Sequence, residues 1–142
     1  MTTSRSNVDQ IILRLPFLPT STNRAWRTFR GKWVLSNEYA EFKKRVAAEV
    51  LRLPPKQRRI TWPFCRVTVY LFPASERKID VDNRNKTLFD ALTFCRFWHD
   101  DDCVTATHNI RCRPVKGGAT VVFFDRDTKP FANIIYDDFK EE

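Results

Sequence analysis

Residues 80–104 read DVDNRNKTLFDALTFCRFWHDDDCV, and the fold and the chemistry of this chain can be worked out from this stretch. Its middle part places apolar residues among polar ones at the spacing of an amphipathic helix: Leu88, Phe89, Ala91 and Leu92. Asp82 is placed to cap that helix, so we expect it to begin at Asn83 and to run for about three turns to Phe94. The acidic run Asp100-Asp101-Asp102 then forms a turn.

Strands are predicted on both sides of this helix. Residues 10–15 form an apolar run closed by Pro16, and residues 62–72 place Cys65, Val67, Val69 and Leu71 on one face with a period of two. Residues 104–112 alternate in the same way, through Val104, Ala106, His108, Ile110 and Cys112. Residues 119–124 predict a last strand, joined to the previous one through Lys116-Gly117-Gly118.

A second helix is expected after Ser36, which is a suitable N-cap. Apolar residues recur at helical spacing as far as Pro54-Pro55, namely Tyr39, Phe42, Val46 and Val50. Before this helix, Gly31 is placed to turn a short hairpin. The whole pattern predicts an α+β fold, in which residues 1–142 form a single compact domain with a mixed β-sheet and two main helices packed on it. Residues 10–125 are the expected core and residues 126–142 the C-terminal tail, which from Pro130 onward is expected to dock on the body or on a partner subunit.

The charge balance favours a polyanionic partner. The 142 residues carry 25 Lys and Arg against 17 Asp and Glu, a net charge of +8. Because residues 126–142 hold three basic and five acidic side chains, residues 1–125 carry +10. A sequence pI near 9.6 is typical of proteins that bind nucleic acid.

Several other classes of protein are disfavoured. The four cysteines contain no Cys-x-x-Cys pair, so they predict reduced thiols rather than a zinc cluster or a disulfide framework. Three glycines leave no phosphate-binding loop, and we therefore expect no nucleotide cofactor. No apolar run is long enough for a signal peptide or a membrane span, so we expect a cytoplasmic protein.

Carboxylates concentrated in a basic protein indicate a metal site. Asp80 and Asp82 leave the same face of an extended segment about 6.6 Å apart, which suits two ligands of one hard cation. A helix cap and a solvated acidic turn would explain the same residues. Asp82, Lys86 and Asp90 also fall on one helix face, where a surface ladder of salt bridges is an equally good interpretation.

The complete string of residues 80–104 resembles the signature of the RusA family of Holliday junction resolvases. The shared features are Asp-x-Asp-Asn, a Lys three residues after the Asn, a Phe-Asp-Ala-Leu helix turn, and an aromatic residue before an Asp-Asp pair and a Val. Residues 19–24, PTSTNR, resemble the early Pro-rich segment of the family, and residues 114–118, PVKGG, resemble its C-terminal hairpin.

The resemblance implies a site as well as a fold. It assigns the metal-binding carboxylates to Asp80, Asp82 and Asp101 and the catalytic lysine to Lys86, with Asp100 and Asp90 as further candidates for the metal site or its surroundings. Asp102 departs from the family pattern and leaves open which of the three consecutive acids reaches the metal; we favour Asp101. Oxygen ligands select Mg²⁺, or Mn²⁺ in its place, over zinc.

The resemblance also implies a symmetric homodimer that nicks opposite strands of four-way junction DNA, in a bacterial, phage or prophage setting. The expected DNA-binding residues are Asn23, Arg24, Arg27, Arg30, Lys32 and Lys116. For Trp26, Phe29 and Trp33, core packing is favoured over stacking on bases, while His99 and His108 are too isolated to form a nucleophilic or zinc site.

Two other functions are considered. One is a DNA-binding protein with the same fold that does not cut, against which the full set of Asp80, Asp82, Lys86 and Asp101 argues. The other is a magnesium phosphohydrolase of the haloacid-dehalogenase type. That class places a Thr two residues after the second Asp, where this chain has Arg84.

Overall fold

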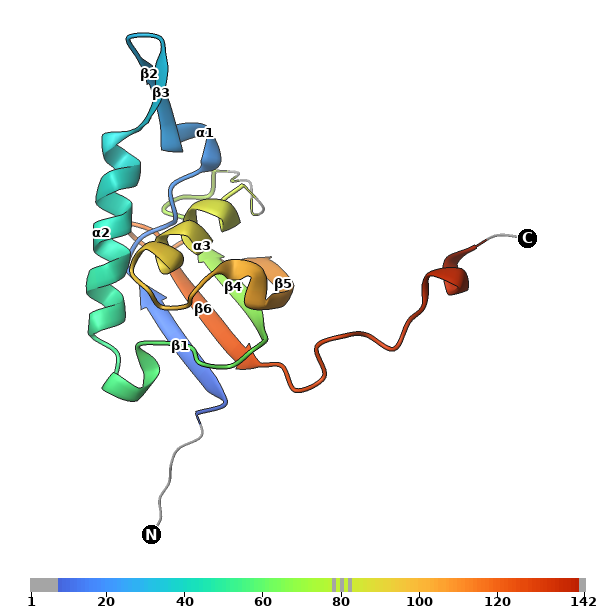
Figure 1. The fold of residues 1–142 in the computed structure, drawn as a ribbon. Helices are drawn as coiled ribbons and strands as arrows, with labels where there is room; N and C mark the ends of the chain where they lie inside the picture. Colours follow the sequence, from blue (N-terminus) through green and yellow to red (C-terminus); the bar gives the residue numbers. More distant parts are fainter. Residues whose placement is uncertain (1–7, 78, 80, 82, 141–142) are drawn as a thin grey trace.

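Four strands form a mixed sheet in the order β1-β6-β4-β5. The strands are β1 (Gln10–Leu15), β4 (Cys65–Phe72), β5 (Val104–Arg111) and β6 (Ala119–Arg126) (Figure 1). Strand β6 runs antiparallel to both of its neighbours, β1 and β4, whereas β4 and β5 are parallel. The structure is a computed structural model and describes residues 8–77, 79, 81 and 83–140.

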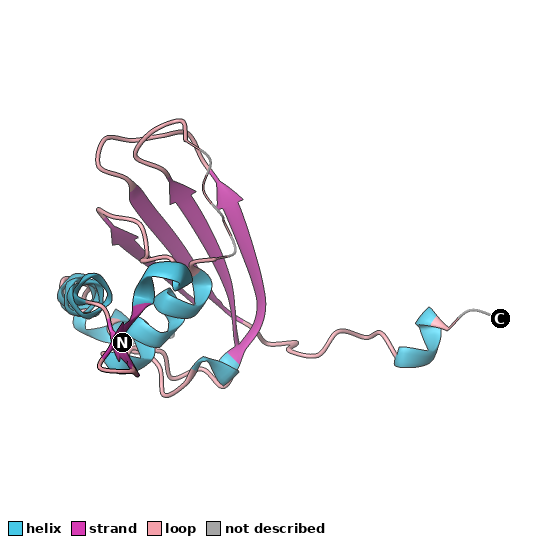
Figure 2. Ribbon diagram, turned by 90° about the horizontal axis from the view of Figure 1, so that it is seen from above, coloured by secondary structure: helices cyan, strands magenta, loops and turns pink. Residues whose placement is uncertain are grey.

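Two helices, α2 (Asn37–Leu51) and α3 (Asn85–Phe94), cover one face of this sheet (Figure 2). The side chains that the period of two predicted to be buried on β4, from Cys65 to Leu71, pack beneath the helices with Ile11, Leu13, Val122 and Phe124. The helices contribute Val46, Leu88 and Leu92 to the same core. The α+β fold with two main helices on a mixed sheet is thus confirmed.

Helix α2 forms where the sequence predicted it. The Ser36 hydroxyl accepts a hydrogen bond from the Tyr39 backbone N–H over 3.1 Å, which satisfies one of the free donors of the first turn. All four apolar residues of the predicted stripe are buried. The helix ends at Leu51, before the two prolines that cannot continue it.

The start of α3 was predicted wrongly. The helix begins at Asn85, two residues later than predicted, and its N-cap position is Arg84, without a side-chain capping bond; the predicted cap, Asp82, lies outside the described residues. The reason is tertiary: the Arg84 guanidinium donates to the Pro19 carbonyl, and the Thr22 N–H donates to the Asn83 carbonyl over 2.9 Å. These contacts hold residues 83 and 84 outside the helix.

A projecting hairpin precedes α2. Strands β2 (Trp26–Phe29) and β3 (Lys32–Leu35) pair antiparallel around Arg30 and Gly31, whose φ angles of 53° and 77° suit the two-residue turn predicted at Gly31. A short helix, α1 (Thr22–Ala25), which the sequence did not reveal, leads into it. Figure 1 shows the hairpin extending beyond the sheet, next to the first turn of α2.

The predicted hairpin between the last two strands is wrong. Strand β4 lies between β5 and β6, so the segment through Lys116 crosses over the end of β4 instead of closing a two-stranded turn. It is tied there by a hydrogen bond from the Val115 N–H to the Pro73 carbonyl over 2.9 Å. Gly117 and Gly118, with φ angles of 81° and 76°, supply the left-handed backbone that this connection needs.

Within the described residues, no helix covers the other face of the sheet (Figure 2). Ile12, Tyr70 and Phe123 are half-buried on it, with the Tyr70 and Phe123 rings in edge contact at 5.5 Å. The register with β4 places His108 and Ile110 of the edge strand β5 on this open face, and Asn109 on the helix side. Val104 packs against the core, but the register shift that follows it turns the rest of the predicted apolar alternation of β5 outward, away from the core.

The remaining elements are three short 3₁₀ helices, η1 (Pro55–Gln57), η2 (Asp101–Cys103) and η3 (Tyr136–Phe139). The last of these ends a C-terminal segment that extends away from the body (Figure 1). The four cysteines are free thiols, as predicted. In the described part of the chain, no helix has the length and apolar character needed to cross a membrane.

Candidate active site

The loop between β4 and α3 carries the predicted Asp-x-Asp pair. Asp80 and Asp82 both lie outside the described residues, but their neighbours are placed. Ile79 and Val81 pack against the hydrophobic core. The Asn109 side-chain amide, from the helix side of β5, donates to the Val81 carbonyl over 2.6 Å and to the Asn85 side-chain oxygen over 3.0 Å. Strand β5 therefore anchors the loop on both sides of Asp82.

The early segment that resembles the family supports the same loop. The backbone N–H and the hydroxyl of Thr22 both donate to the Asn83 carbonyl, over 2.9 and 3.0 Å. The buried Thr87 hydroxyl, in the first turn of α3, donates to the Thr20 carbonyl. This segment therefore positions the acidic loop and connects it directly to the base of the β2–β3 hairpin.

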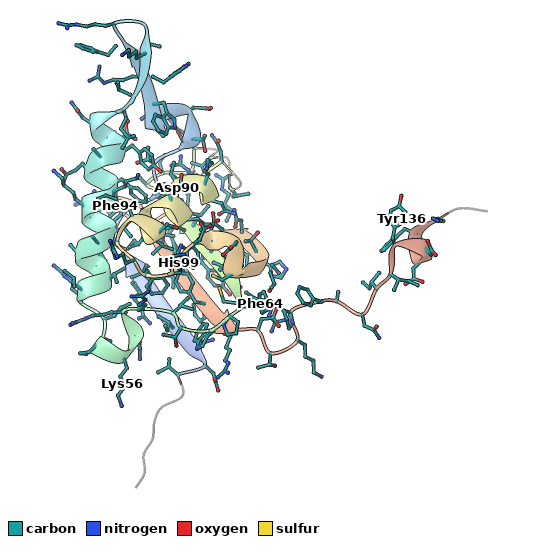
Figure 3. The ribbon with its side chains drawn as sticks, in the orientation of Figure 1. Lys56, Phe64, Asp90, Phe94, His99 and Tyr136 are labelled. Atoms are coloured by element: carbon teal, nitrogen blue, oxygen red, sulfur yellow. The ribbon has the colours of Figure 1, made fainter. Side chains whose placement is uncertain are left out.

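One face of α3 carries Lys86 and Asp90, which form an ion pair one helical turn apart. The Lys86 ammonium lies 3.5 Å from an Asp90 carboxylate oxygen. The same oxygen accepts a hydrogen bond from the buried Tyr39 hydroxyl of α2 over 3.3 Å. Burial raises the pKa of Tyr39, and the nearby Asp90 carboxylate raises it further, so this hydroxyl remains a neutral donor. Figure 3 shows Asp90 on the side of α3 that faces α2.

The acidic turn after α3 brings a second group of carboxylates to this region. In η2, burial raises the pKa of Asp101, and the negative charges of Asp100 and Asp90 raise it further, while the Lys86 ammonium opposes them. Asp101 therefore shares one electrostatic environment with the α3 pair. Asp100 has a separate local role, because its carboxylate accepts from the Asp101 backbone N–H over 2.8 Å. Asp101 is half-buried, whereas Asp100 and Asp102 are exposed.

Three of the candidate acids, Asp90, Asp100 and Asp101, interact electrostatically near α3. Within residues 8–77, 79, 81 and 83–140, no group of three or more His, Cys, Asp or Glu is arranged to hold a metal ion. Asp90, Asp100 and Asp101 supply only oxygen ligands, and the negative charges of Asp100 and Asp90 add to the burial that raises the pKa of Asp101. This is the environment that a hard divalent cation stabilises, and the loop with Asp80 and Asp82 leads directly into α3.

The predicted DNA-binding residues lie on exposed surfaces. Asn23 and Arg24 are on α1, while Arg27, Arg30 and Lys32 are on the β2–β3 hairpin. The Arg27 and Arg30 guanidinium groups lie over the Phe29 ring, 5.6 and 5.1 Å from its centroid. Lys116 is exposed in the connection that crosses the end of β4.

The expectation of core packing for the hairpin aromatics is wrong. Trp26, Phe29 and Trp33 are 44%, 50% and 73% exposed. A two-stranded ribbon that projects from the body has solvent on both faces, so the core offers these rings no place. Trp26 contacts the body through an edge contact of its ring with that of Tyr39 at 6.2 Å. The hairpin therefore presents basic and aromatic side chains together, and the two histidines take no part in a described cluster of metal ligands.

Two residues that the site depends on, Tyr39 and Asn109, are not among the predicted site residues. The helical spacing of Tyr39 predicts a core residue of α2, and the structure shows that its hydroxyl also donates a hydrogen bond to Asp90. Asn109 occupies a polar position of an alternating strand and is not among the residues that this alternation singles out. A polar residue on the inward face of an edge strand, next to the acidic loop, is the signal that would have identified it.

Comparisons with known proteins identify the family of this chain. The sequence model of the family described as Endodeoxyribonuclease RusA matches residues 16–123. The chain is 30% identical over 106 residues to Crossover junction endodeoxyribonuclease RusA of Escherichia coli strain K12, covering 75% of this chain and 86% of that protein. Relatives of the same name from Enterobacteria phage 82 and Shigella sonnei strain Ss046 are 30% and 29% identical, with the same coverage. The chain belongs to the RusA family of endodeoxyribonucleases.

Proposed function

We propose that this protein resolves four-way DNA junctions as a homodimer, by Mg²⁺-dependent hydrolysis of one phosphodiester bond in each of two strands. Membership of the RusA family supports the reaction class, and the matched relatives are named as crossover junction endodeoxyribonucleases. The observation that carries the proposal is the shared environment of Lys86, Asp90 and Asp101 at the start and end of α3. The Asp80–Asp82 loop enters this same helix.

Asp80, Asp82 and Asp101 are the proposed ligands of the cation, with Asp90 and Asp100 as further candidates. A bound Mg²⁺ would supply Lewis-acid polarisation of the phosphate and a water molecule of lowered pKa. The donor set fits this ion, because the described acids are oxygen ligands held among like charges. The Asn109 and Thr22 hydrogen bonds hold the loop backbone at Val81 and at Asn83, the residues on either side of Asp82 in the sequence.

Lys86 is the proposed electrostatic partner of the reacting phosphate. Its side chain is 72% exposed, so the ammonium can reach a phosphodiester that approaches α3 from solvent. Asp90 is held by the Tyr39 hydroxyl and draws the ammonium to one side of the helix. When DNA binds, the ammonium can offset the charge that develops on the phosphoryl and leaving oxygens.

The hairpin is the proposed junction-binding element. Its Arg and Lys side chains are exposed and suit the phosphate backbone, which supplies affinity without sequence information. Trp33 and Phe29 offer flat apolar faces that can stack on bases unpaired at a branch point. The hydrogen bonds from Thr22 to Asn83 join this surface to the acidic loop, so binding and cutting are mechanically connected.

The homodimer follows from the symmetry of the reaction. Two opposed strands must be cut during one encounter, and each described chain contains one set of candidate residues. A two-fold axis shared by protein and junction would present one site to each strand.

The experiment that tests the proposal is cleavage of a synthetic four-way junction, beside linear duplex of the same sequence, with and without Mg²⁺. We expect junction cleavage only with the metal, and a loss of at least about 100-fold in single-turnover rate for Asp82→Asn and for Asp101→Asn. Junction binding by both variants should persist or tighten, because each removes a negative charge facing DNA.

Asp102→Asn is the matched control, since it changes an exposed neighbour in the same acidic turn. It should cut at nearly the wild-type rate. Normal cleavage by Asp82→Asn would overturn the metal-site assignment, whereas loss of cutting in Asp102→Asn alone would move the third ligand from Asp101 to Asp102. Equal cutting of duplex and junction would refute junction selectivity.

A further inference from the structure

The C-terminal arm, residues 127–140, has a composition unlike that of the body. Its large apolar side chains are 57% to 79% exposed, namely Phe131, Ile134, Ile135, Tyr136 and Phe139. Beyond residue 126 the sequence holds five acidic and two basic side chains, whereas the rest of the chain is strongly basic. The family match ends at residue 123, so the arm lies outside the matched domain. Such an apolar, acidic segment is a candidate for docking on another surface.

The root of the arm is firmly held. The Asp127 N–H donates to the Phe64 carbonyl over 3.0 Å, and the Thr105 hydroxyl donates to the Asp127 carboxylate over 2.5 Å. The Phe131 ring then meets the Phe64 ring in an edge contact at 5.5 Å. After Phe131 the arm leads away from the body, and Figure 3 shows Tyr136 on the far side from Lys56.

The tip of the arm has a defined shape. In η3, the Asp138 carboxylate accepts from the Ile135 backbone N–H over 3.1 Å, and the Lys140 ammonium lies 2.9 Å from an Asp137 oxygen. Tyr136 and Phe139 remain exposed on this ordered turn. With Glu141 and Glu142 following in the sequence, residues 136–142 carry four acidic side chains against one basic side chain.

A pocket of about 430 Å³ next to the root of the arm is apolar and basic, and so complements the apolar and acidic tip of the arm. Its apolar walls are Ile11, Trp62 and Pro63, and its basic residues are Lys56, Arg59 and Arg126. We call it the Trp62 pocket. Arg126 pairs with Asp9 over 3.6 Å, whereas Lys56 and Arg59 make no ion pair within the described part of the chain. The Trp62 indole is fixed by its hydrogen bond to the Val8 carbonyl over 2.9 Å.

We propose that two copies of this chain exchange their arms, so that the tip η3 of each protomer occupies the Trp62 pocket of the other. This inference rests on the dimeric enzyme proposed above and identifies a contact that holds the dimer together. An aromatic side chain of the tip fills the apolar part of the pocket, while the acidic side chains face Lys56 and Arg59.

The position of the pocket makes this exchange self-consistent. Arg126 lines the pocket and is the last residue before the arm, so each arm starts beside the pocket that receives its partner's tip. Under a two-fold axis, the two arms then run antiparallel between the two pockets, and the interface closes without further copies. Phe131, Ile134 and Ile135 lie between root and tip, where the two arms can cover each other's apolar side chains.

Paired charge reversals test the exchange in the full-length chain. The arm variant is Asp137→Lys with Asp138→Asn, in which the Asn keeps an oxygen for the Ile135 N–H. The pocket variant is Lys56→Glu with Arg59→Glu, both at exposed positions. Sedimentation velocity and light scattering at a series of concentrations should show that each variant alone dissociates at least about tenfold more readily than the unaltered chain.

Mixing the two variants distinguishes exchange from folding back. In a mixed dimer, the reversed arm meets the reversed pocket and the unaltered arm meets the unaltered pocket, so both contacts become attractive. We expect the mixture to regain dimer stability to within about threefold of the unaltered chain. A control pair, Lys44→Glu with Arg113→Glu, changes the same number of exposed charges elsewhere and should leave the dimer intact.

Other results would overturn the inference. If the mixture fails to recover dimerisation, the arm does not dock on a second copy. A dimer that is insensitive to both variants would leave the proposed dimeric enzyme standing without arm exchange, and a monomeric unaltered chain would contradict both. Weakened junction binding by the pocket variant, with an unchanged dimer, would show that the pocket holds DNA. Junction cleavage measured on the same preparations tests the enzyme separately, because loss of cleavage with an arm-dependent dimer would refute only the nuclease function.

Discussion

The Asn109 side-chain amide donates to the Val81 carbonyl over 2.6 Å, joining the edge strand β5 to the residue between Asp80 and Asp82. The same amide also donates to the Asn85 side chain at the start of α3. A single side chain thus fixes the loop with respect to the helix that carries Lys86. We regard Asn109 as a positioning residue, since it acts through the backbone of the loop.

Replacing Asn109 should therefore affect metal use more than folding. In Asn109→Ala we expect the Mg²⁺ concentration for half-maximal cleavage to rise about tenfold or more, as when partners of metal ligands are removed. The free energy of unfolding should fall by about 1–2 kcal/mol, because two hydrogen bonds of a half-buried amide are lost. Cleavage measured over a Mg²⁺ series, together with thermal melting, gives both quantities.

Thr107→Ala is the matched control for Asn109, two residues earlier on the same face of β5 and exposed. It should leave the Mg²⁺ dependence unchanged. A normal Mg²⁺ midpoint in Asn109→Ala, with lowered stability alone, would limit Asn109 to a structural role.

Local patterns predicted the elements of the fold but not their order. The buried residues of β4 and the capped stripe of α2 follow from periodicity, because side chains alternate across a strand and repeat along a helix. The insertion of β4 between β5 and β6 depends on pairing between distant segments, and no local pattern records it. The start of α3 was misjudged for the same reason, since Arg84 is held by Pro19, far away in the sequence.

The candidate site, like the fold, could be predicted only where it depends on local sequence. Lys86 and Asp90 share a helix face as their spacing requires, and the alternative of an ion pair between them is also correct. That Asp101 lies near this pair depends on the turn of η2, and that Tyr39 binds Asp90 depends on the packing of α2 against α3. Neither follows from local sequence. Exposure of Trp33 could not be read from its apolar character, because hydrophobicity does not reveal that a hairpin leaves the body.

Lys86→Met separates the catalytic role of Lys86 from its ion pair. The pair with Asp90 is largely exposed, so its loss should change the free energy of unfolding by no more than about 1 kcal/mol. Single-turnover cleavage of the junction should nevertheless fall about 100-fold, because the ammonium no longer stabilises the transition state. Asp90→Asn keeps the lysine and should cut better than Lys86→Met. Equal activity of Lys86→Met and the unaltered chain would reduce Lys86 to a surface partner of Asp90.

Because of Tyr39, we expect the free energy of unfolding to fall in alkaline solution. Burial and the Asp90 charge raise its folded-state pKa, whereas in the unfolded chain the phenol ionises near pH 10. When folding raises the pKa of a group, the stability that the group contributes is fully present below its unfolded-state pKa and is lost as the pH rises above that value. For Tyr39, the free energy of unfolding should therefore fall above about pH 10, by up to about 1.4 kcal/mol per pH unit. The Tyr39→Phe variant should be less stable than the unaltered chain at pH 8, but its free energy of unfolding should fall less between pH 9.5 and 11. Parallel denaturant melts across this range measure the difference, and identical slopes would contradict the assignment.

The exposed hairpin allows phosphate contacts to be separated from base stacking. Trp33 is 73% exposed, so Trp33→Ala should change the free energy of unfolding by less than about 0.5 kcal/mol. If the ring stacks on an unpaired base, junction affinity should fall by about 1–3 kcal/mol with the salt dependence unchanged. Arg27→Ala with Arg30→Ala should instead flatten the plot of log affinity against log salt by about 1.8, since two phosphate contacts release their counterions.

Leu51→Ala serves as the control for Trp33→Ala, because Leu51 is a comparably exposed apolar residue at the far end of α2. It should bind junctions normally at every salt concentration. Fluorescence anisotropy titrations at four salt concentrations give the affinity and the slope for all variants. If Trp33→Ala binds as tightly as Leu51→Ala, the tryptophan does not contact bases. An unchanged slope in the double arginine variant would place the hairpin outside the DNA interface, since lost phosphate contacts must reduce counterion release.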